Sequence, residues 1–279
     1  MQKRILSPVF IRKYRESLVH DEKSNATIEK YMHDIRTFSE FAQTQNITKE
    51  LTLAYKNMLL KNYAVTSANS MLAALNSFLQ FAGWHDAKVK QFKVQKKAYC
   101  KAEKELTKQE YMRLIDAAEK KSVRLSLVIQ TICCLGIRVS ELACITVEAL
   151  QNGEAVVSCK GKTRTILIVS ALRKKLLKYV RSKGIKMGPV FVTKNGRPLN
   201  RCNIWREMKG LGCDAHVLSE KIFPHNLRHL FARTFYAMEK DIANLADILG
   251  HSSINTTRIY IITTGAEHRR KMERLQLIS

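Results

Sequence analysis

The stretch "PHNLRHLFAR" (residues 224–233) places two histidines and two arginines within ten residues. Its leucines and its phenylalanine fall on one side of a helical projection, so the stretch predicts an amphipathic helix with a cationic face. A basic face is ordinary in itself, because the same His-x-x-Arg spacing recurs at His33 and Arg36 in a segment that reads as purely structural. The meaning of this stretch therefore depends on the rest of the chain.

Composition indicates the class of partner. The chain carries 48 Lys and Arg against 24 Asp and Glu, a formal net charge of +24 spread along its whole length. Such a protein attracts polyanions. No apolar run approaches the roughly 18 residues of a membrane span, and the seven cysteines show no C-x-x-C spacing. These features favour a reduced, metal-free, cytoplasmic protein that binds nucleic acid rather than lipid.

The first 95 residues predict a small helical domain. Apolar residues recur at helical spacing in two segments, at Ile28, Tyr31, Met32, Ile35, Phe38 and Ala42, and again at Met71, Leu72, Leu75, Phe78, Leu79 and Ala82. Each segment therefore presents one apolar stripe to a shared core. We expect a helical bundle over residues 1–95.

A basic linker is predicted next. The stretch "KVKQFKVQKKAYCKAEK" (residues 88–104) carries seven lysines and one glutamate without a steady period. It is typical of a linker that follows DNA phosphates, although a merely solvated connector has the same composition. We place the linker at residues 96–105, with Lys96 and Lys97 in contact with DNA. Thr107 and Glu110 then stand in capping-box relation, so a second domain begins near residue 106 and extends to 279.

The second domain predicts mainly helix with a small sheet. After the apolar helix "LSLVIQTICCLGIRVSELACI" come two β-branched runs, "EAVVSCK" and "TILIV", on either side of the turn "GKTR". This pattern predicts a β-hairpin. Helical spacing returns from Asn200 onward, and Gly250 is placed as a C-cap after "DIANLADIL". The expected fold class is mainly α with a small β-sheet: a helical N-terminal domain and an α+β C-terminal domain.

Six polar side chains that could bind or react with a ligand occur in the second domain, each at the end of an expected element: Arg138, Lys160, His225, Arg228, His251 and Tyr260. The segments that hold them are "LGIRVSEL", "CKGKTR", "PHNLRHLFA" and "LGHSSINTTRIYI". In this order they resemble, box by box, the catalytic domain of the tyrosine recombinases, the family of phage integrases and Xer-type resolvases. The resemblance is strong over residues 106–265 and weaker over the N-terminal domain, which it implies to be a SAM-like core-binding domain.

Breaking a phosphodiester without a metal requires a nucleophile, neutralisation of the phosphate charge and a proton for the leaving oxygen. The resemblance makes Tyr260 the nucleophile, although a phenol with a pKa near 10 needs a base or dense positive charge to react at neutral pH. It makes Arg138 and Arg228 a clamp on the phosphate oxygens. Glu141, three residues after Arg138, is expected to hold that arginine in place.

The remaining roles are assigned with alternatives. The resemblance favours Lys160 as general acid at the hairpin, with Lys162 as the competing candidate. Lys162 and Arg164 are otherwise expected to contact backbone phosphate. His225 is expected to take the tyrosyl proton or to bind the phosphate, and His251 to donate to a phosphate oxygen. The sequence leaves open which histidine has which role. His229 is expected to be structural, and Arg233 and Arg258 face either DNA or solvent.

The resemblance implies a site-specific recombinase that cuts and rejoins double-stranded DNA through a 3′-phosphotyrosyl intermediate, without ATP, metal or another cofactor. Tyr260 is followed by "IITTG", which departs from Xer proteins and favours an integrase or transposase of a mobile element. The alternatives are an Xer-type resolvase, a topoisomerase and a catalytically silent DNA-binding relative. Expected partners are inverted core sites and, on synapsed DNA, a homotetramer of a protein that is monomeric in solution. The tail "GAEHRRKMERLQLIS" docks either on a neighbouring protomer or on its own domain.

Overall fold

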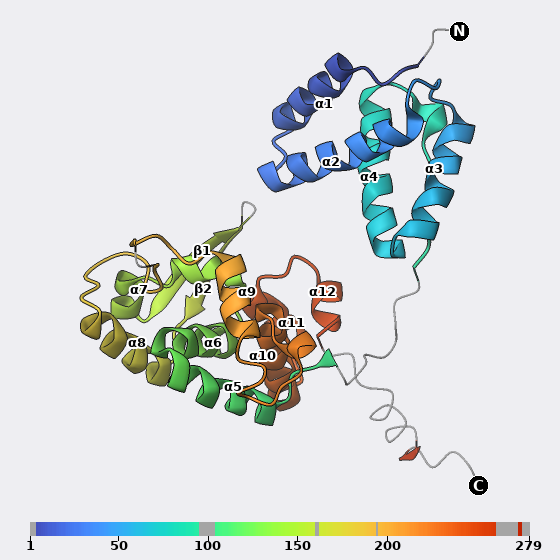
Figure 1. Cartoon of the computed structure of the whole chain (residues 1–279). Helices are drawn as coiled ribbons and strands as arrows, with labels where there is room; N and C mark the ends of the chain where they lie inside the picture. The colour runs from blue at the N-terminus through green and yellow to red at the C-terminus, as the bar shows by residue number, and fades with distance from the viewer. Residues whose placement is uncertain (1–3, 95–103, 160–161, 194, 261–272, 275–279) are drawn as a thin grey trace. The chain divides into compact units, whose positions relative to one another are not determined.

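The computed structural model describes residues 4–94, 104–159, 162–193, 195–260 and 273–274. The chain divides into two compact units, Met1–Lys96 and Lys97–Ser279 (Figure 1). Helices dominate both units, and the described strands pair in a two-stranded sheet. The predicted fold class, mainly α with a small sheet, is confirmed.

Helices build the N-terminal unit: α1 (Pro8–His20), α2 (Asn25–Ala42), α3 (Lys49–Asn62), α4 (Val65–Phe81) and the short 3-10 helix η1 (His85–Ala87). The first three begin at hydroxyl side chains. Ser7, Ser24 and Thr48 each accept a hydrogen bond from a backbone N–H of the first turn. Each cap satisfies a donor that has no intrahelical acceptor, and so fixes where its helix starts.

The predicted apolar stripes meet in the core of this unit. α4 packs against α1, α2 and α3. Phe78 of α4 makes edge-to-face ring contacts with Tyr14 at 5.1 Å and Phe10 at 5.6 Å between centroids. Most residues of the two stripes are buried there: Ile28, Met32, Ile35, Phe38, Ala42, Met71, Leu72, Leu75, Phe78 and Leu79. The helical spacing in the sequence therefore identified this core.

The C-terminal unit begins with α5 (Lys108–Lys121), α6 (Val123–Leu135), the 3-10 helix η3 (Val139–Cys144) and α7 (Val147–Asn152). After the strands β1 (Glu154–Cys159) and β2 (Lys162–Leu167) come α8 (Ser170–Ser182), α9 (Arg201–Lys209), η4 (Ser219–Lys221), α10 (Pro224–Glu239), α11 (Ile242–Leu249) and α12 (Ile254–Arg258). The predicted capping box is confirmed, because Thr107 and Glu110 exchange both hydrogen bonds at the start of α5.

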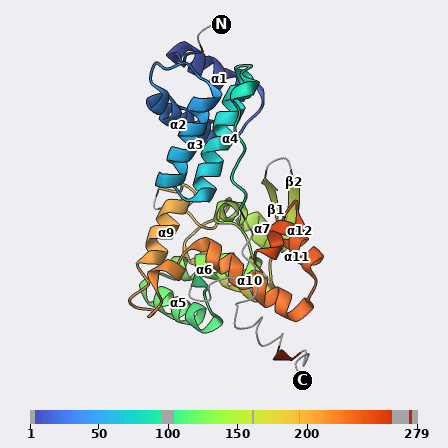
Figure 2. The same cartoon turned by 90° about the vertical axis from the view of Figure 1, so that its right-hand side faces the viewer.

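Helix α10, which holds the stretch at residues 224–233, packs against α6 and α11 (Figure 2). α6 is apolar on nearly all sides and lies inside the unit, with buried residues on every turn. Both α6 and α11 end at glycines in the left-handed conformation, Gly136 and Gly250. The predicted C-cap at Gly250 is confirmed. α10 is thereby flanked by two helices that stop beside it.

The predicted hairpin is confirmed, but its second strand is longer than expected. β1 and β2 pair antiparallel from Glu154 opposite Leu167 to Cys159 opposite Lys162. The residues "KTR" (162–164), assigned above to the turn, therefore belong to β2. The reason lies in the alternation of the strand: Arg164 and Ile166 share its inner side, and the Arg164 guanidinium has a buried partner there, Glu141.

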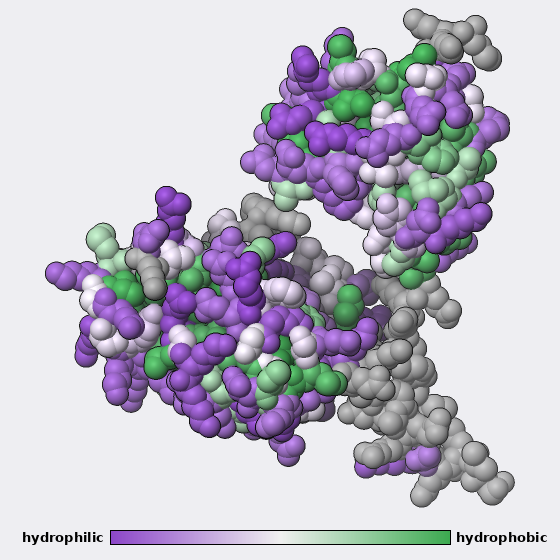
Figure 3. Space-filling view, in the orientation of Figure 1, coloured by the Kyte–Doolittle hydropathy of each residue, from purple (hydrophilic) through white to green (hydrophobic). Residues whose placement is uncertain are grey.

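Hydrophilic side chains cover most of the surface of each unit in the view of Figure 3, as the high net charge leads one to expect. Apolar residues on this face occur in small scattered groups. Within the described residues, no helix combines the length and the apolar character required to cross a membrane.

Gly136 and Gly184 provide a matched test of the packing at the end of α6. Both have positive φ, +60° and +66°, but a Cβ at Gly136 would lie 2.3 Å from the Phe231 ring, whereas one at Gly184 meets nothing within 4 Å. Gly184→Ala should cost roughly 1 kcal/mol for the left-handed backbone. Gly136→Ala should cost about 3 kcal/mol, because the ring must also move. Urea unfolding measures both, and equal losses would show that the close approach to Phe231 is unimportant.

Candidate active site

The ends of α6 and α11 create a place that favours a cation. A helix leaves its last carbonyl groups without intrahelical donors and carries partial negative charge at that end. Gly136 and Gly250 end these helices with φ of +60° and +65°. Both are also closely approached, since a Cβ on Gly250 would lie 2.5 Å from the Cδ atom of Arg164. The local sequence "LG" at both helix ends is thus explained by backbone conformation and by packing.

Arg228 of α10 is the cation at this place. Its side chain is 1% exposed, and its guanidinium donates to the carbonyl oxygens of Gly136 at 2.6 Å and Leu249 at 2.7 Å. Burial, followed by the charge of Arg138, lowers the pKa of Arg228 below its usual value. Charge-assisted hydrogen bonds to two helix ends offset this cost of burial. Its Nε atom has no hydrogen-bond partner among the described residues.

Glu141 connects three arginines. It is 3% exposed, and its carboxylate accepts from Arg138 Nη1 at 2.9 Å, from the Arg138 backbone N–H at 2.7 Å and from Arg164 Nη2 at 2.7 Å. Arg228 Nη1 lies 4.0 Å from the same carboxylate. The expectation that Glu141 holds Arg138 is confirmed. A single buried negative charge is therefore shared by three guanidinium groups.

Arg164 was expected to contact the DNA backbone, but its side chain is mostly buried and bonded within the protein. Its side chain is 15% exposed, because residue 164 belongs to the inner side of β2. Its Nη1 donates to the carbonyl oxygen of Ile248, and its Nη2 donates to Glu141. Arg164 thus joins the hairpin to α11 and to the buried carboxylate, and its guanidinium is used inside the protein.

The hydrogen bonds of His251 fix its tautomer. Arg228 Nη2 lies 2.9 Å from Nε2 of His251, and an arginine nitrogen can only donate. Nε2 must therefore accept, so Nδ1 carries the proton and donates to Thr257 Oγ1 at 2.8 Å. Burial, with the charges of Arg228 and Arg138, lowers the pKa of His251 to about 4, which agrees with a neutral ring. In this arrangement His251 orients Arg228 and has no Nε2 proton to donate.

Tyr260 lies just after α12 and is 5% exposed. Its hydroxyl oxygen is 3.4 Å from His225 Nε2, and its ring is stacked on His251 at 5.4 Å between centroids. The His229 ring is nearer still, at 4.4 Å, and also contacts His225 at 4.8 Å. His229, expected from the sequence to be structural, thus lies directly beside Tyr260. Its position one residue after Arg228 on α10 was the available signal.

A cavity of 700 Å³ opens beside this cluster. Arg138, which lines it, keeps 36% of its side chain exposed, so one guanidinium of the network is accessible from outside. The other lining residues are Glu141, Val157, Thr163, Arg164, Asp247, Gly250, His251, Ser252 and Thr256. The cavity therefore brings together residues from η3, the hairpin and the end of α11. Of the two arginines that line it, Arg138 is the more exposed, at 36% against 15% for Arg164.

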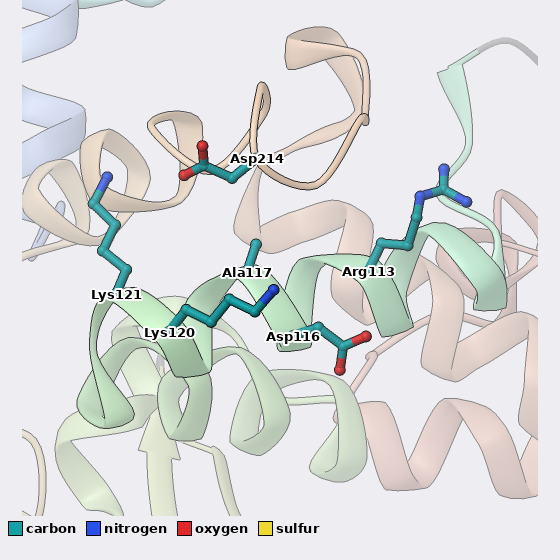
Figure 4. A pocket seen from close by; sticks show the side chains of 6 residues that line it. All are labelled: Arg113, Asp116, Ala117, Lys120, Lys121 and Asp214. Carbon is teal, nitrogen blue, oxygen red and sulfur yellow. The ribbon is translucent and has the colours of Figure 1, made fainter.

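A second cavity, of 590 Å³, lies between α5 and the segment after α9, where Lys120, Lys121 and Arg113 of α5 stand near Asp116 and Asp214 (Figure 4). Its cations and carboxylates are mixed, and Arg113 is already used: its Nε donates to the carbonyl oxygen of Ala215 at 2.9 Å. None of the predicted site residues lines this cavity, which we do not assign to a ligand.

Several predicted residues lie outside the described residues: Lys96, Lys97, Lys160 and, except for residues 273 and 274, the tail 265–279. The side chain of Lys162 is also outside the description. Within the described ranges, no group of three or more His, Cys, Asp or Glu side chains is arranged to hold a metal ion. A continuous series of contacts joins six of the predicted residues: Arg138, Glu141, Arg228, His251, Tyr260 and His225.

The histidine pKa values predict how stability depends on pH. Burial lowers the pKa of His229 and His251 from 6.5 to about 4, so between these values the unfolded chain binds protons that the folded chain does not. Stability should therefore fall as the pH drops from about 6.5 towards 4. His229→Phe keeps a ring against Tyr260 and should make this decline shallower by roughly 1 kcal/mol per pH unit. Urea unfolding at a series of pH values measures it, and parallel curves would contradict it.

Comparison with known proteins matches both units of the chain. The model of the phage integrase family matches residues 104–266, and the model of the phage integrase N-terminal SAM-like domain matches residues 11–86. The first match contains Arg138, His225, Arg228, His251 and Tyr260. It covers more than half of the chain.

Full-length relatives agree with these matches. The tyrosine recombinase XerA of Pyrococcus furiosus is 28% identical over 100% of this chain and 98% of its own length. The tyrosine recombinase XerD of Halalkalibacterium halodurans is 30% identical over 88% of this chain and 90% of its own. In structure, a lambda integrase tetramer bound to a Holliday junction matches with a TM-score of 0.74 and 19% identity, over 90% of this chain and 76% of that one. The chain belongs to the phage integrase family.

Proposed function

We propose that this protein is a site-specific DNA recombinase that cuts and rejoins DNA through a covalent 3′-phosphotyrosyl bond to Tyr260. The observation that carries the proposal is the place of Tyr260: its hydroxyl lies 3.4 Å from His225 Nε2, and its ring is stacked on His251, which is hydrogen-bonded to Arg228. These side chains come from separate segments of the sequence, so their meeting is a property of the fold. The match to the phage integrase family supports a role for these side chains in cutting and rejoining DNA.

The nucleophile requires a proton acceptor. Burial, together with the charges of Arg228 and Arg138, lowers the pKa of His225, so its ring is neutral at neutral pH and Nε2 is able to accept. Tyr260 then attacks the phosphorus, its proton passes to His225, and the bond to the 5′-oxygen breaks. The leaving oxygen takes a proton from Lys160, or from Lys162 as the alternative. Because the phosphotyrosyl bond keeps the energy of the broken diester, the reverse attack rejoins a strand without ATP or metal.

Arg138 and Arg228 neutralise the phosphate in this proposal. Arg138 reaches the cavity with 36% of its side chain exposed, and Glu141 fixes the direction of its guanidinium. Arg228 is held more deeply, but its Nε is a donor without a partner among the described residues, and a bound phosphate oxygen would supply one. His251 supports Arg228 through Nε2, which makes it a positioning residue in the unliganded protein.

The proposed substrate is double-stranded DNA with inverted core sites. The net charge of +24 favours a polyanion, and the lysine-rich stretch, with Lys96 and Lys97, gives phosphates a continuous basic path. Lys162 adds a charge at the hairpin. A protein that is monomeric alone would assemble as a homotetramer on two synapsed sites, an arrangement supported by the lambda integrase tetramer on its junction. Its place of action is then the cytoplasm, where the DNA is.

The biological role has two candidates. The residues after Tyr260 favour the integrase of a mobile element, whereas the full-length likeness to XerA and XerD favours the resolution of chromosome or plasmid dimers. The two roles can be distinguished by comparing the efficiency of recombination on two substrates. One is a plasmid with two core sites in direct repeat, and the other is a pair of DNA molecules with one site each. A resolvase deletes the intervening segment efficiently, and an integrase joins the separate molecules efficiently.

Tyr260→Phe tests the chemistry directly. The substitution removes one oxygen and little packing, so binding to a core site should stay within about twofold while the covalent adduct disappears. A half-site with a nick beside the cleavage point traps the adduct, because the short leaving strand diffuses away. Denaturing gels measure the adduct and mobility shifts measure binding.

Tyr236→Phe is the matched control, since Tyr236 lies on α10 against the same small apolar cluster and loses the same atom. It should form adduct at the wild-type rate. An adduct that persists in Tyr260→Phe would exclude Tyr260 as nucleophile, and a wild-type protein that binds but never forms an adduct would favour the silent DNA-binding alternative.

A further inference from the structure

Helix α10 is fastened to the segment that arrives from the lysine-rich stretch. Asn226 is 3% exposed and lies between His225 and Arg228 in the sequence. Its side-chain Nδ2 donates to the carbonyl oxygen of Lys104 at 3.0 Å and to that of Lys221 at 2.8 Å. The first turn of α10 therefore holds the backbone of residue 104.

Arg233 makes a second attachment two turns later. Its Nη1 donates to the carboxylate of Glu105, and its Nη2 donates to the carbonyl oxygen of Leu106 at 2.7 Å. The Arg233 and Glu105 side chains are 27% and 18% exposed, so this ion pair is largely protected from water. Leu106 is buried in the core of the unit. We call these contacts of Asn226 and Arg233 with residues 104–106 the linker clamp.

The linker clamp and the candidate active site occupy different sides of the same helix. Successive residues of an α-helix are turned by about 100°, so Asn226 and Arg233, seven apart, share one face. Arg228, two residues after Asn226, is turned by about 200° and faces the other way. Residues 104–106 are thus attached to the side of α10 that lies away from Arg228.

The charge of the chain changes sign where the linker clamp begins. Residues 88–104 contain seven lysines, which DNA attracts, and Glu105 follows them directly. DNA repels a carboxylate, whereas Arg233 binds the carboxylate of Glu105. Within the described residues, neither Glu105 nor Arg233 makes a hydrogen bond or ion pair with a residue around Tyr260.

We propose that Asn226 and Arg233 are positioning residues that transmit the seating of the lysine-rich stretch and the N-terminal unit on DNA to His225 and Arg228. The inference rests on the proposed function. Bound DNA fixes the path of the chain up to residue 104, and the linker clamp converts that path into the position of α10. Because small displacements of reacting groups change rates strongly, cleavage becomes fast when both units are seated.

The test compares two nicked half-sites with the full-length protein. The long half-site carries DNA for both units, and the short one extends only far enough for the C-terminal unit. Rates of adduct formation are taken at saturating protein, so that affinity does not enter. The variants are Arg233→Met, which removes the linker clamp at this residue, Arg233→Lys, which keeps the charge, and Glu105→Gln, a mild change at a partly exposed position.

The wild type should cleave the long half-site about tenfold faster than the short one. Arg233→Met and Glu105→Gln should slow cleavage of the long half-site alone, so that the ratio of the two rates falls to within about twofold of one. Arg233→Lys should keep part of the wild-type ratio. Glu239→Gln, an exposed carboxylate at the end of α10 with no ion pair in the described structure, is the control and should keep the wild-type ratio.

A merely structural role gives a different result. If the clamp only stabilises the fold, the variants slow both half-sites by a common factor and the ratio stays as in the wild type, which overturns the proposal. A wild-type ratio of one overturns it as well. Both results leave the recombinase function intact, because adduct forms in each, whereas absence of any wild-type adduct is failure of the proposed function itself.

Discussion

The buried guanidinium of Arg228 between two helix ends is the interaction on which the rest of the site depends. A charge that is 1% exposed requires acceptors on several sides. α6 and α11 provide them by ending beside α10, and the positive φ and close packing at Gly136 and Gly250 favour glycine at both positions. The ends of α6 and α11 beside α10 thus determine both how α10 packs and where its buried cation lies.

The charges around Arg228 are balanced in a way that suits a phosphate. Glu141 is one carboxylate among three arginines, so the network carries two positive charges in excess. The neighbouring histidines add none at neutral pH, because burial lowers the pKa of His251 and His229 to about 4 and lowers that of His225 too. In the proposed function a phosphate would add negative charge to this network, and the neutral rings next to Tyr260 would be able to accept its proton.

Helical spacing, the capping box at Thr107 and the C-cap at Gly250 could be predicted from sequence because each depends on residues close together in the chain. The contacts of Arg164 could not, because its partner Glu141 is brought to β2 by the fold, and a basic residue near a turn otherwise indicates a surface. The tautomer of His251 was hidden for the same reason: it depends on Arg228 and Thr257. Resemblance named the candidate residues of the site, and the structure shows which of the described ones contact one another.

Glu141 balances the buried charge of Arg228, whose Nη1 atom lies 4.0 Å from its carboxylate. The direct measurement is the free energy of unfolding of Glu141→Gln in two backgrounds, the wild type and Arg228→Met. In the wild type the substitution leaves an uncompensated buried charge and should cost about 3 kcal/mol. With Arg228 replaced by a neutral side chain, it should cost less by at least about 1 kcal/mol, because the two groups interact across 4.0 Å. Equal losses in both backgrounds would contradict the account.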